Sequence, residues 1–262
     1  MRFHRLFTDP SAGVHKRRGF SNAGHRFADY NAHRKGESRL QFRHEVKHKI
    51  SNLDMLILRQ RLGAVMAPDC HAPNGEYEVR SLYFDNLEDK ALREKLDGVY
   101  VREKYRIRLY NNDPSVIHLE RKFKRGALGH KDSALLTPEQ ARRIAAGDVR
   151  WMAESANNVI LGFYSRICSE GLAAKAIVDY TRKAFVFGPG NVRVTLDSHI
   201  RTALRSTDFL NPHCATVPVP DSPCILEVKW DNYLPDAIRD MVQLGDRCSS
   251  AYSKYAACRM YD

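Results

Sequence analysis

The chain has 262 residues, of which 43% are apolar and 28% charged, a composition typical of a globular protein with one substantial core or two small ones. It shows no apolar stretch long enough to span a bilayer and no secretory signal, and its cysteines are widely spaced, so we expect a cytoplasmic protein with reduced thiols and no transmembrane segment. Lys and Arg exceed Asp and Glu by 11, which points to an anionic partner: nucleic acid, a phospholipid surface or a phosphorylated small molecule.

Residues 1–39 differ in composition from the rest of the chain. They carry nine Lys and Arg against three Asp and Glu, and their apolar residues follow no period. Such a segment does not bury enough surface to offset the conformational entropy lost on ordering. The sequence therefore predicts a disordered basic tail over residues 1–39 and a globular domain over residues 40–262.

Strand-like and helix-like patterns alternate from residue 40 onward. Residues 42–50 alternate as a strand does, and Ser51 then caps a helix that extends to about Gly63. The further predicted elements, in chain order, are a strand at 77–84, a helix at 86–96, strands at 101–110 and 116–124 joined by a turn at 111–114, a helix that begins at 137, a helix at 151–169, strands at 174–187, 191–199 and 224–230, and short helices at 234–244 and 249–259. Seven strands with interspersed helices predict an α+β domain built on an antiparallel sheet.

Charged residues recur on one face of five of these strands. Because residues two apart share a face, Lys104, Arg106 and Arg108 lie together, opposite an apolar face. The other charged faces are Arg43, Glu45, Lys47 and Lys49; Glu120, Lys122 and Lys124; Arg193, Thr195 and Asp197; and Glu227 and Lys229. The alternative is a half-buried sheet whose polar face is only wet, but like charges on neighbouring strands repel, which favours a bound anion. We therefore expect a closed barrel with a basic lumen and with helices packed around its outside.

The residue types on these faces suit phosphate chemistry. Guanidinium groups bind phosphate oxygens bidentately, and the few acids, above all Glu227, suit a divalent cation that bridges phosphates. The chain shows no phosphate-binding glycine loop, no dinucleotide-binding turn and no hydrolase nucleophile elbow. A nucleic-acid-binding protein would need an exposed basic surface with stacking aromatics, so we expect no nucleic-acid partner.

A series of short motifs over residues 40–260 resembles the VTC domain, a member of the triphosphate tunnel metalloenzymes, the superfamily that includes the CYTH proteins. The motifs are Glu45-Val46-Lys47, Tyr83-Phe84-Asp85-Asn86, Tyr105-Arg106-Ile107-Arg108, Glu120-Arg121-Lys122, Tyr180-Thr181-Arg182, Arg193-Val194-Thr195-Leu196-Asp197, Leu226-Glu227-Val228-Lys229 and Ser253-Lys254-Tyr255. Each motif alone is weak, but eight in the same order are specific. The resemblance implies an eight-stranded antiparallel tunnel that binds a polyphosphate chain.

The resemblance also implies an activity, which is transfer of the ATP γ-phosphate onto inorganic polyphosphate or pyrophosphate with Mn²⁺ or Mg²⁺. By matching positions, the phosphate ligands would be Lys47, Arg106, Arg108, Lys122, Arg182, Arg193, Lys229 and Lys254, with Arg80 as a further member. The resemblance assigns the metal to Glu227 and implies that Arg106, Arg108 and Lys122 hold the transferred group, so that these four residues would be the catalytic ones.

One position departs from the wider superfamily. Its hydrolases and cyclases typically begin with an E-x-E-x-K strand, whereas Arg43 stands here in place of the first acid, two residues before Glu45. This departure disfavours a two-metal hydrolase or a cyclase. A triphosphatase that uses water as the acceptor and a polyphosphate-binding module without catalysis are the alternatives to a polymerase, and the sequence does not fix the oligomeric state.

Overall fold

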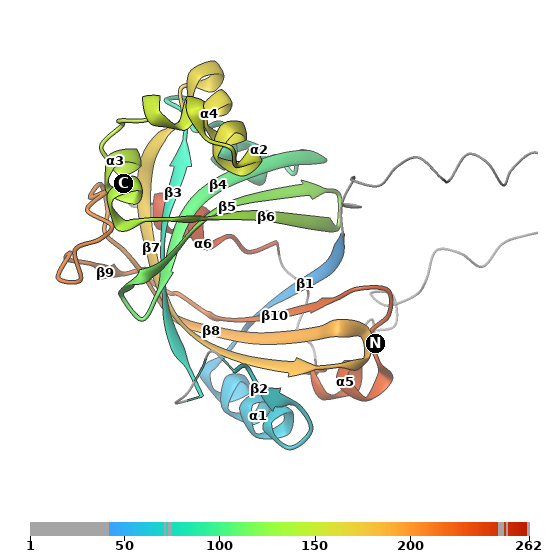
Figure 1. The fold of residues 1–262 in the computed structure, drawn as a ribbon. Helices are drawn as coiled ribbons and strands as arrows, with labels where there is room; N and C mark the ends of the chain where they lie inside the picture. Colours follow the sequence, from blue (N-terminus) through green and yellow to red (C-terminus); the bar gives the residue numbers. More distant parts are fainter. Residues whose placement is uncertain (1–41, 71, 73–74, 246–248, 250, 261–262) are drawn as a thin grey trace, which may run out of the picture. The chain divides into compact units, whose positions relative to one another are not determined.

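Eight antiparallel strands form a ring (Figure 1). The computed structural model describes residues 42–70, 72, 75–245, 249 and 251–260, and the predicted tail 1–39 lies outside them. In ring order the strands are β7 (Ala173–Phe187), β3 (Tyr77–Asp85), β4 (Val101–Tyr110), β5 (Asp113–Arg125), β6 (Leu128–Leu136), β1 (Arg43–Ile50), β10 (Cys224–Trp230) and β8 (Val192–Thr202), and β8 pairs back with β7. Two short strands, β2 (Ala67–Pro68) and β9 (Val217–Pro218), extend the edges of β7 and β8. The predicted α+β tunnel fold is confirmed.

The ring is closed unevenly. Among the residues that the structure describes, β1 pairs with β10 over seven positions but meets β6 at only two, Arg43 opposite Gly129 and His44 opposite Leu128. The alternation of apolar residues predicts the other seven strands of the ring and misses β6. That strand carries Gly129, Asp132 and Ser133, which have low β propensity, so its pairing with β5 and not its composition holds it in the sheet.

Most helices cover the outside of the ring. They are α1 (Asn52–Gly63), α2 (Lys90–Leu96), α3 (Pro138–Ala145), α4 (Asn158–Glu170), α5 (Asp236–Met241) and α6 (Lys254–Arg259), with 3-10 turns η1 (Arg150–Glu154) and η2 (Pro189–Asn191). The single helix predicted at 151–169 is wrong, because the side chain of Asn157 caps a new helix by accepting from the backbone N–H of Val159 at 2.9 Å. None of the helices in the described part of the chain is long and apolar enough to cross a bilayer.

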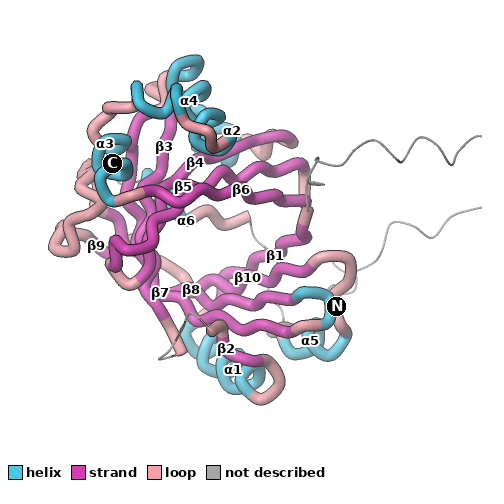
Figure 2. The backbone as a smooth tube through the Cα atoms, viewed as in Figure 1, coloured by secondary structure: helices cyan, strands magenta, loops and turns pink. Residues whose placement is uncertain are grey.

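Two apolar clusters join these helices to the outer face of the sheet. In the first, Phe163 of α4 packs against Tyr105 and Phe84, with ring centroids 4.7 and 4.9 Å apart. In the second, Leu58 of α1 and Ile238 of α5 pack against strands β1, β8 and β10. Figure 2 shows the two groups of helices on different sides of the ring. The apolar faces of the strands therefore point outward into these cores, which leaves the charged faces for the lumen.

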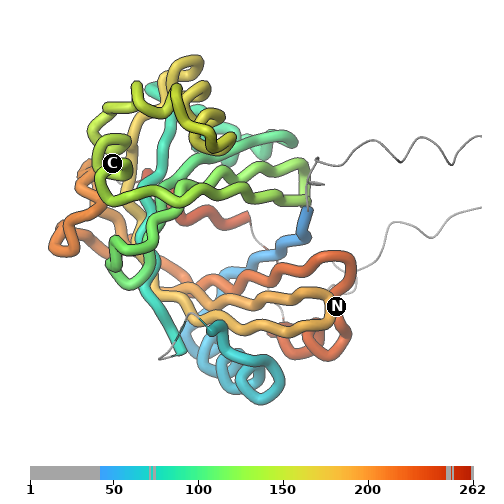
Figure 3. The backbone as a smooth tube through the Cα atoms, viewed as in Figure 1, coloured from blue at the N-terminus to red at the C-terminus, as the bar shows by residue number. Residues whose placement is uncertain are grey.

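The C-terminal helix α6 is the exception to this arrangement. Its Tyr255 is buried and stacks on Tyr83, a lumen-facing residue of β3, with ring centroids 5.0 Å apart. Tyr255 also belongs to an apolar cluster with Ile225 of β10, whose side chain faces the same lumen. In Figure 3 this segment, drawn in red, is seen through the opening of the ring. Helix α6 thus forms part of the lumen wall.

The carboxylate of Asp85 fastens two helices to the end of β3. It accepts hydrogen bonds from the backbone N–H groups of Ala91 and Leu92, in the first turn of α2, and from the hydroxyl of Tyr255. The residue at the N-cap position, Asp89, has a left-handed conformation and makes no side-chain cap bond, so Asp85 supplies the cap from a distance.

We therefore expect Asp85→Ala to lower the free energy of unfolding by about 3 kcal/mol, because it removes a cap and leaves buried donors without an acceptor. Urea unfolding measures this loss. Asp85→Asn, which keeps one carbonyl acceptor, should cost less than half as much. Equal stability of wild type and Asp85→Ala would show that α2 and α6 do not depend on this carboxylate.

Candidate functional site

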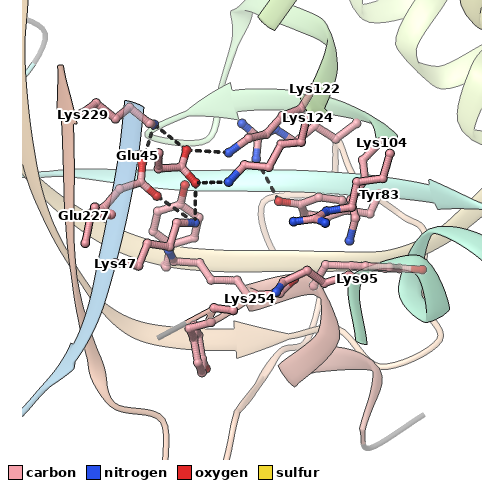
Figure 4. A pocket seen from close by; sticks show the side chains of 18 of the residues that line it. Glu45, Lys47, Tyr83, Lys95, Lys104, Lys122, Lys124, Glu227, Lys229 and Lys254 are labelled. Atoms are coloured by element: carbon pink, nitrogen blue, oxygen red, sulfur yellow. Dashed lines mark hydrogen bonds and ion pairs between the residues drawn. The ribbon is translucent and has the colours of Figure 1, made fainter. Parts of the chain in front are cut away.

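The lumen contains a cavity of about 510 Å³ lined by charged side chains (Figure 4). Its charged lining consists of Lys47, Lys95, Arg102, Lys104, Arg106, Arg108, Lys122, Lys124, Arg182, Lys229 and Lys254, with Glu45 and Glu227. Eleven cations face two carboxylates, so the potential inside the cavity is strongly positive and attracts anions.

Strand β4 supplies the central row of this lining. Its residues alternate, so that Tyr105, Ile107 and Leu109 are buried in the outer core while Arg106 and Arg108 point into the cavity. The tight turn at Asn111 and Asn112, both with positive φ, connects β4 to β5. The same register brings the lumen-facing residues of β5 opposite those of β4.

A cluster of lysines and glutamates lies where β1 and β10 pair. Lys47 contacts Glu227 at 2.9 Å, and Lys229 forms a second ion pair with Glu227. Glu45 accepts from Lys122 of β5 at 2.8 Å, which links the wall of β1 and β10 to that of β4 and β5. Figure 4 shows both glutamates surrounded by lysine amines on one side of the cavity.

This cluster keeps both carboxylates ionised. Burial by itself would raise the pKa of Glu227, but the charges of Lys229 and Lys47 outweigh it and hold the pKa well below the ordinary value. The pKa of Glu45 is lowered in the same way, burial being outweighed chiefly by Lys122 and Lys47. Two permanently charged carboxylates therefore face the cavity, each neutralised by lysines that an incoming phosphate group can attract.

Two further acids hold the arginines from behind. Glu120, with 1% of its surface exposed, accepts from Arg106 at 2.7 Å and from Lys131 at 2.8 Å. Asp197, fully buried, binds Arg182 in bidentate fashion at 2.6 and 2.8 Å. These bonds fix the guanidinium planes before any ligand arrives, which is the preorganisation that phosphate recognition exploits.

Lys254 joins the same site from α6. Its amine donates to Asp197 at 2.6 Å and lies 4.6 Å from the ring centroid of Tyr180. The Tyr180 hydroxyl accepts from Arg108 at 3.0 Å. The C-terminal segment thereby brings a cation to the arginines of β4 and β7, although it is separated from them by many residues in the sequence.

Two of the predicted phosphate ligands do not line the cavity. Arg80 shares the outer face of the sheet with Asp179, which its side chain binds at 2.8 Å, and it also donates to the backbone carbonyl of Asn211. Arg193 stands opposite Lys229 in register, but its side chain binds Asp69 and the hydroxyl of Tyr77. The other seven predicted phosphate ligands and the predicted metal ligand Glu227 all come together at the cavity.

The cavity also includes residues outside the predicted ligand set. Lys104 and Lys124 were already on the charged faces of their strands, so alternation alone could have added them. Lys95 comes from α2, where no local signal marks it. Tyr180 lies in the middle of β7, and its only signal is its place in the Tyr180-Thr181-Arg182 motif. Glu45 contributes more to the cavity than its place in the sequence indicates, because it forms ion pairs with several of the lysines that line it.

The hydroxyl of Tyr83 has an unusual electrostatic setting. Burial raises its pKa, but Arg106 and Arg108 outweigh this effect, and Arg106 donates to the hydroxyl at 2.8 Å, which lowers the pKa to about 8. We expect spectrophotometric titration to show one tyrosine that ionises about two pH units before an ordinary tyrosine. Tyr83→Phe should remove this early step, whereas Tyr233→Phe, at an exposed position, should leave it. A titration without an early step would contradict the described contact.

Comparison with protein-family profiles gives a match over most of the chain. A family profile described as VTC domain matches residues 42–261. No curated protein matches the chain significantly.

Several solved structures align with the chain at low identity. HpAC1 of Hippeastrum, described as an adenylyl cyclase candidate with a dominant triphosphatase activity, is 14% identical over 84% of this chain and 95% of that chain, with a TM-score of 0.49. An adenylate cyclase candidate of Bacillus halodurans is 12% identical over 71% and 78%, and a protein of Pyrococcus horikoshii is 12% identical over 76% and 85%, each with a TM-score of 0.40. All three TM-scores lie below 0.5, so these likenesses support no statement about what this chain binds or transforms.

Proposed function

The chain belongs to the VTC domain family, and from this premise we propose that it is a polyphosphate polymerase, which transfers the γ-phosphate of ATP onto inorganic polyphosphate inside the basic lumen. The observation that carries the proposal is the charge of the cavity, an excess of nine cations over carboxylates in the lining. Even with Glu120 and Asp197 counted behind the wall, the excess is seven. A linear polyanion with several linked phosphates satisfies such a site, whereas a single phosphate leaves most of it uncompensated.

The proposed reaction does not require a covalent intermediate with the protein. The acceptor is a terminal oxygen of a phosphate chain, which is already ionised, so no protein base is required. Catalysis then consists of aligning acceptor and leaving group and of neutralising the charge that spreads over the transferred phosphoryl group. In this proposal Arg106, Arg108 and Lys122 hold that group, and the acids behind them keep their orientation.

The cavity also fits a divalent metal that is held partly by substrate. Among the described residues, no three side chains of the His, Cys, Asp and Glu types come together as a ready-made cage. Mg²⁺ needs only one or two carboxylates together with water and phosphate oxygens, and Glu227, with Glu45 beside it, supplies these. In this proposal Glu227, with Glu45 beside it, would hold the Mg²⁺ or Mn²⁺, and the metal would supply positive charge that offsets the charge of the phosphate groups. Lys47 and Lys229, which neutralise Glu227 in the free protein, then become available to phosphate oxygens.

The test is an incubation of the whole chain with ATP, Mn²⁺ or Mg²⁺ and a short polyphosphate, resolved on a gel stained for polyphosphate. A ladder of longer chains, formed at the expense of ATP, supports the polymerase. Release of free phosphate without a ladder means that water is the acceptor and that the protein is a triphosphatase. Binding of polyphosphate without turnover leaves a non-catalytic module.

A further inference from the structure

Three cations of the cavity lie away from the carboxylates. They are Lys95 on α2 and Arg102 and Lys104 on β4, which line the cavity together with the residues already described. Figure 4 shows Lys95, Lys104 and Tyr83 on one side of the cavity and the cluster of Glu45 and Glu227 on the other. Residues on the same face of a strand repeat about every 6.7 Å, so Arg102 lies roughly 13 Å along β4 from Arg106. A single phosphoryl group held at Arg106 does not reach that far.

The sheet register sets like charges directly opposite each other in this part. Lys104 of β4 stands opposite Lys122 of β5, and Arg102 stands opposite Lys124. Glu45 neutralises Lys122 and Lys124, but no carboxylate among the described residues forms an ion pair with Lys104 or Arg102, so the repulsion from the opposite strand falls on these two cations. At the next position the pattern changes, because Arg106 stands opposite Glu120, which neutralises it.

No carboxylate in the described part of the chain forms an ion pair with Lys95, Arg102 or Lys104, although all three are only partly exposed. Arg102 donates to the backbone carbonyl of Val99 at 2.6 Å, and the amine of Lys104 lies 5.0 Å from the ring centroid of Tyr255. These neighbours orient the two side chains without neutralising them.

The pKa values of the two lysine amines are lowered, as expected for partly buried cations without an ion pair to a carboxylate. Burial lowers the pKa of Lys104 to about 8, and the opposing effects of Tyr83 and Asp85 do not restore it. Burial also lowers the pKa of Lys95, and the charges of Arg102 and Lys124 lower it further. An anion with several oxygens would relieve both the desolvation and the repulsion.

We infer that Lys95, Arg102 and Lys104 form a second phosphate-binding subsite, which holds linked phosphates of a polyphosphate chain beyond the group that is transferred. The inference rests on the proposed function and deepens it, since it assigns a chain-length preference to residues outside the transfer centre. The occupant is a phosphate chain because the three groups are all cations, without the carboxylate that a metal or an ammonium group would need.

The experiment compares the binding of tripolyphosphate and of long-chain polyphosphate to the whole chain, by calorimetry without nucleotide. The test variant is Lys95→Gln/Arg102→Gln/Lys104→Gln. The matched control, Arg59→Gln/Arg150→Gln/Arg205→Gln, removes the same charge from three exposed positions. Relative to this control, we expect the test variant to bind the long chain about 30-fold more weakly, while its affinity for tripolyphosphate changes less than about twofold.

Two further measurements separate a loss of phosphate binding from a loss of folding. Urea unfolding should show the test variant at least as stable as wild type, because the replacement relieves repulsion, and Lys104→Arg should bind the long chain as wild type does. If the test variant bound both ligands equally more weakly, the three residues would belong to the transfer centre. If it bound both ligands as tightly as the control does, the proposed subsite would be wrong. If wild type itself binds neither ligand, the proposed function fails, a result that the variants do not influence.

Discussion

Replacement of Arg106 by Met is expected to lower the rate of chain elongation by about 10³-fold, the range seen when one preorganised donor to a transferring phosphoryl group is removed. Arg106 lies at the centre of the cavity wall, bound to Glu120 at 2.7 Å and to the Tyr83 hydroxyl at 2.8 Å. Burial works against its charge, but Tyr83 and Glu120 raise its pKa well above the ordinary value, so the guanidinium is charged at every relevant pH. The measurement is the initial rate of polyphosphate formation from ATP.

Loss of Arg106 also leaves Glu120 with fewer partners, and an unpaired buried carboxylate costs stability by itself. The double variant Arg106→Met/Glu120→Gln removes both charges and separates the two effects, because it should fold as wild type does and remain inactive. Arg121→Met is the control, since Arg121 lies on the outer face of β5 and binds Glu103 at 2.8 Å. Full activity in the double variant would show that Arg106 is not part of the transfer centre.

The lumen face of the sheet could be predicted because alternation along a strand is a local property. In β4 the apolar residues pack outward against α4, so the charged residues that alternate with them must point into the lumen. The two helix starts with capping boxes, at Ser51 and Thr137, are equally local, and both are found where the sequence predicts them.

Other features depend on contacts between distant segments. Arg80 and Arg106 are both strand arginines with apolar neighbours, but the register turns Arg80 outward to Asp179, a residue 99 positions away. The strand β6 has no apolar alternation of its own until Ala134, and only the hairpin at Gly126, whose φ is +59°, brings it beside β5. Likewise, Lys95 reaches the cavity because Asp85 anchors α2, which no spacing in the helix itself indicates.

Glu227→Gln is expected to lower elongation by about 10³-fold and to raise the Mn²⁺ concentration for half-maximal rate at least about tenfold, if this carboxylate holds the metal. The side chain is nearly isosteric, and only 4% of the residue is exposed, so the substitution changes charge more than shape. The pKa of Glu227 lies well below its ordinary value, with burial outweighed by Lys229 and Lys47, so the wild-type group stays ionised throughout a pH series. The rate should therefore show no acid limb from this residue near neutral pH.

Glu227 has two possible roles, to hold a cation or to orient Lys47 and Lys229, and metal dependence separates them. A carboxylate that only orients lysines would lose rate on substitution without a change in the Mn²⁺ requirement, because the lysines act on phosphate and not on the metal. Glu45→Gln tests the neighbouring carboxylate in the same way, since Glu45 contacts Lys47 at 3.5 Å and Lys122 at 2.8 Å. If the Mn²⁺ concentration for half-maximal rate rose in Glu45→Gln but not in Glu227→Gln, the metal ligand would be Glu45 of β1 and not Glu227 of β10. A requirement that moves in both would mean that the two carboxylates share one cation across the β1–β10 pair, as their common set of lysines already indicates.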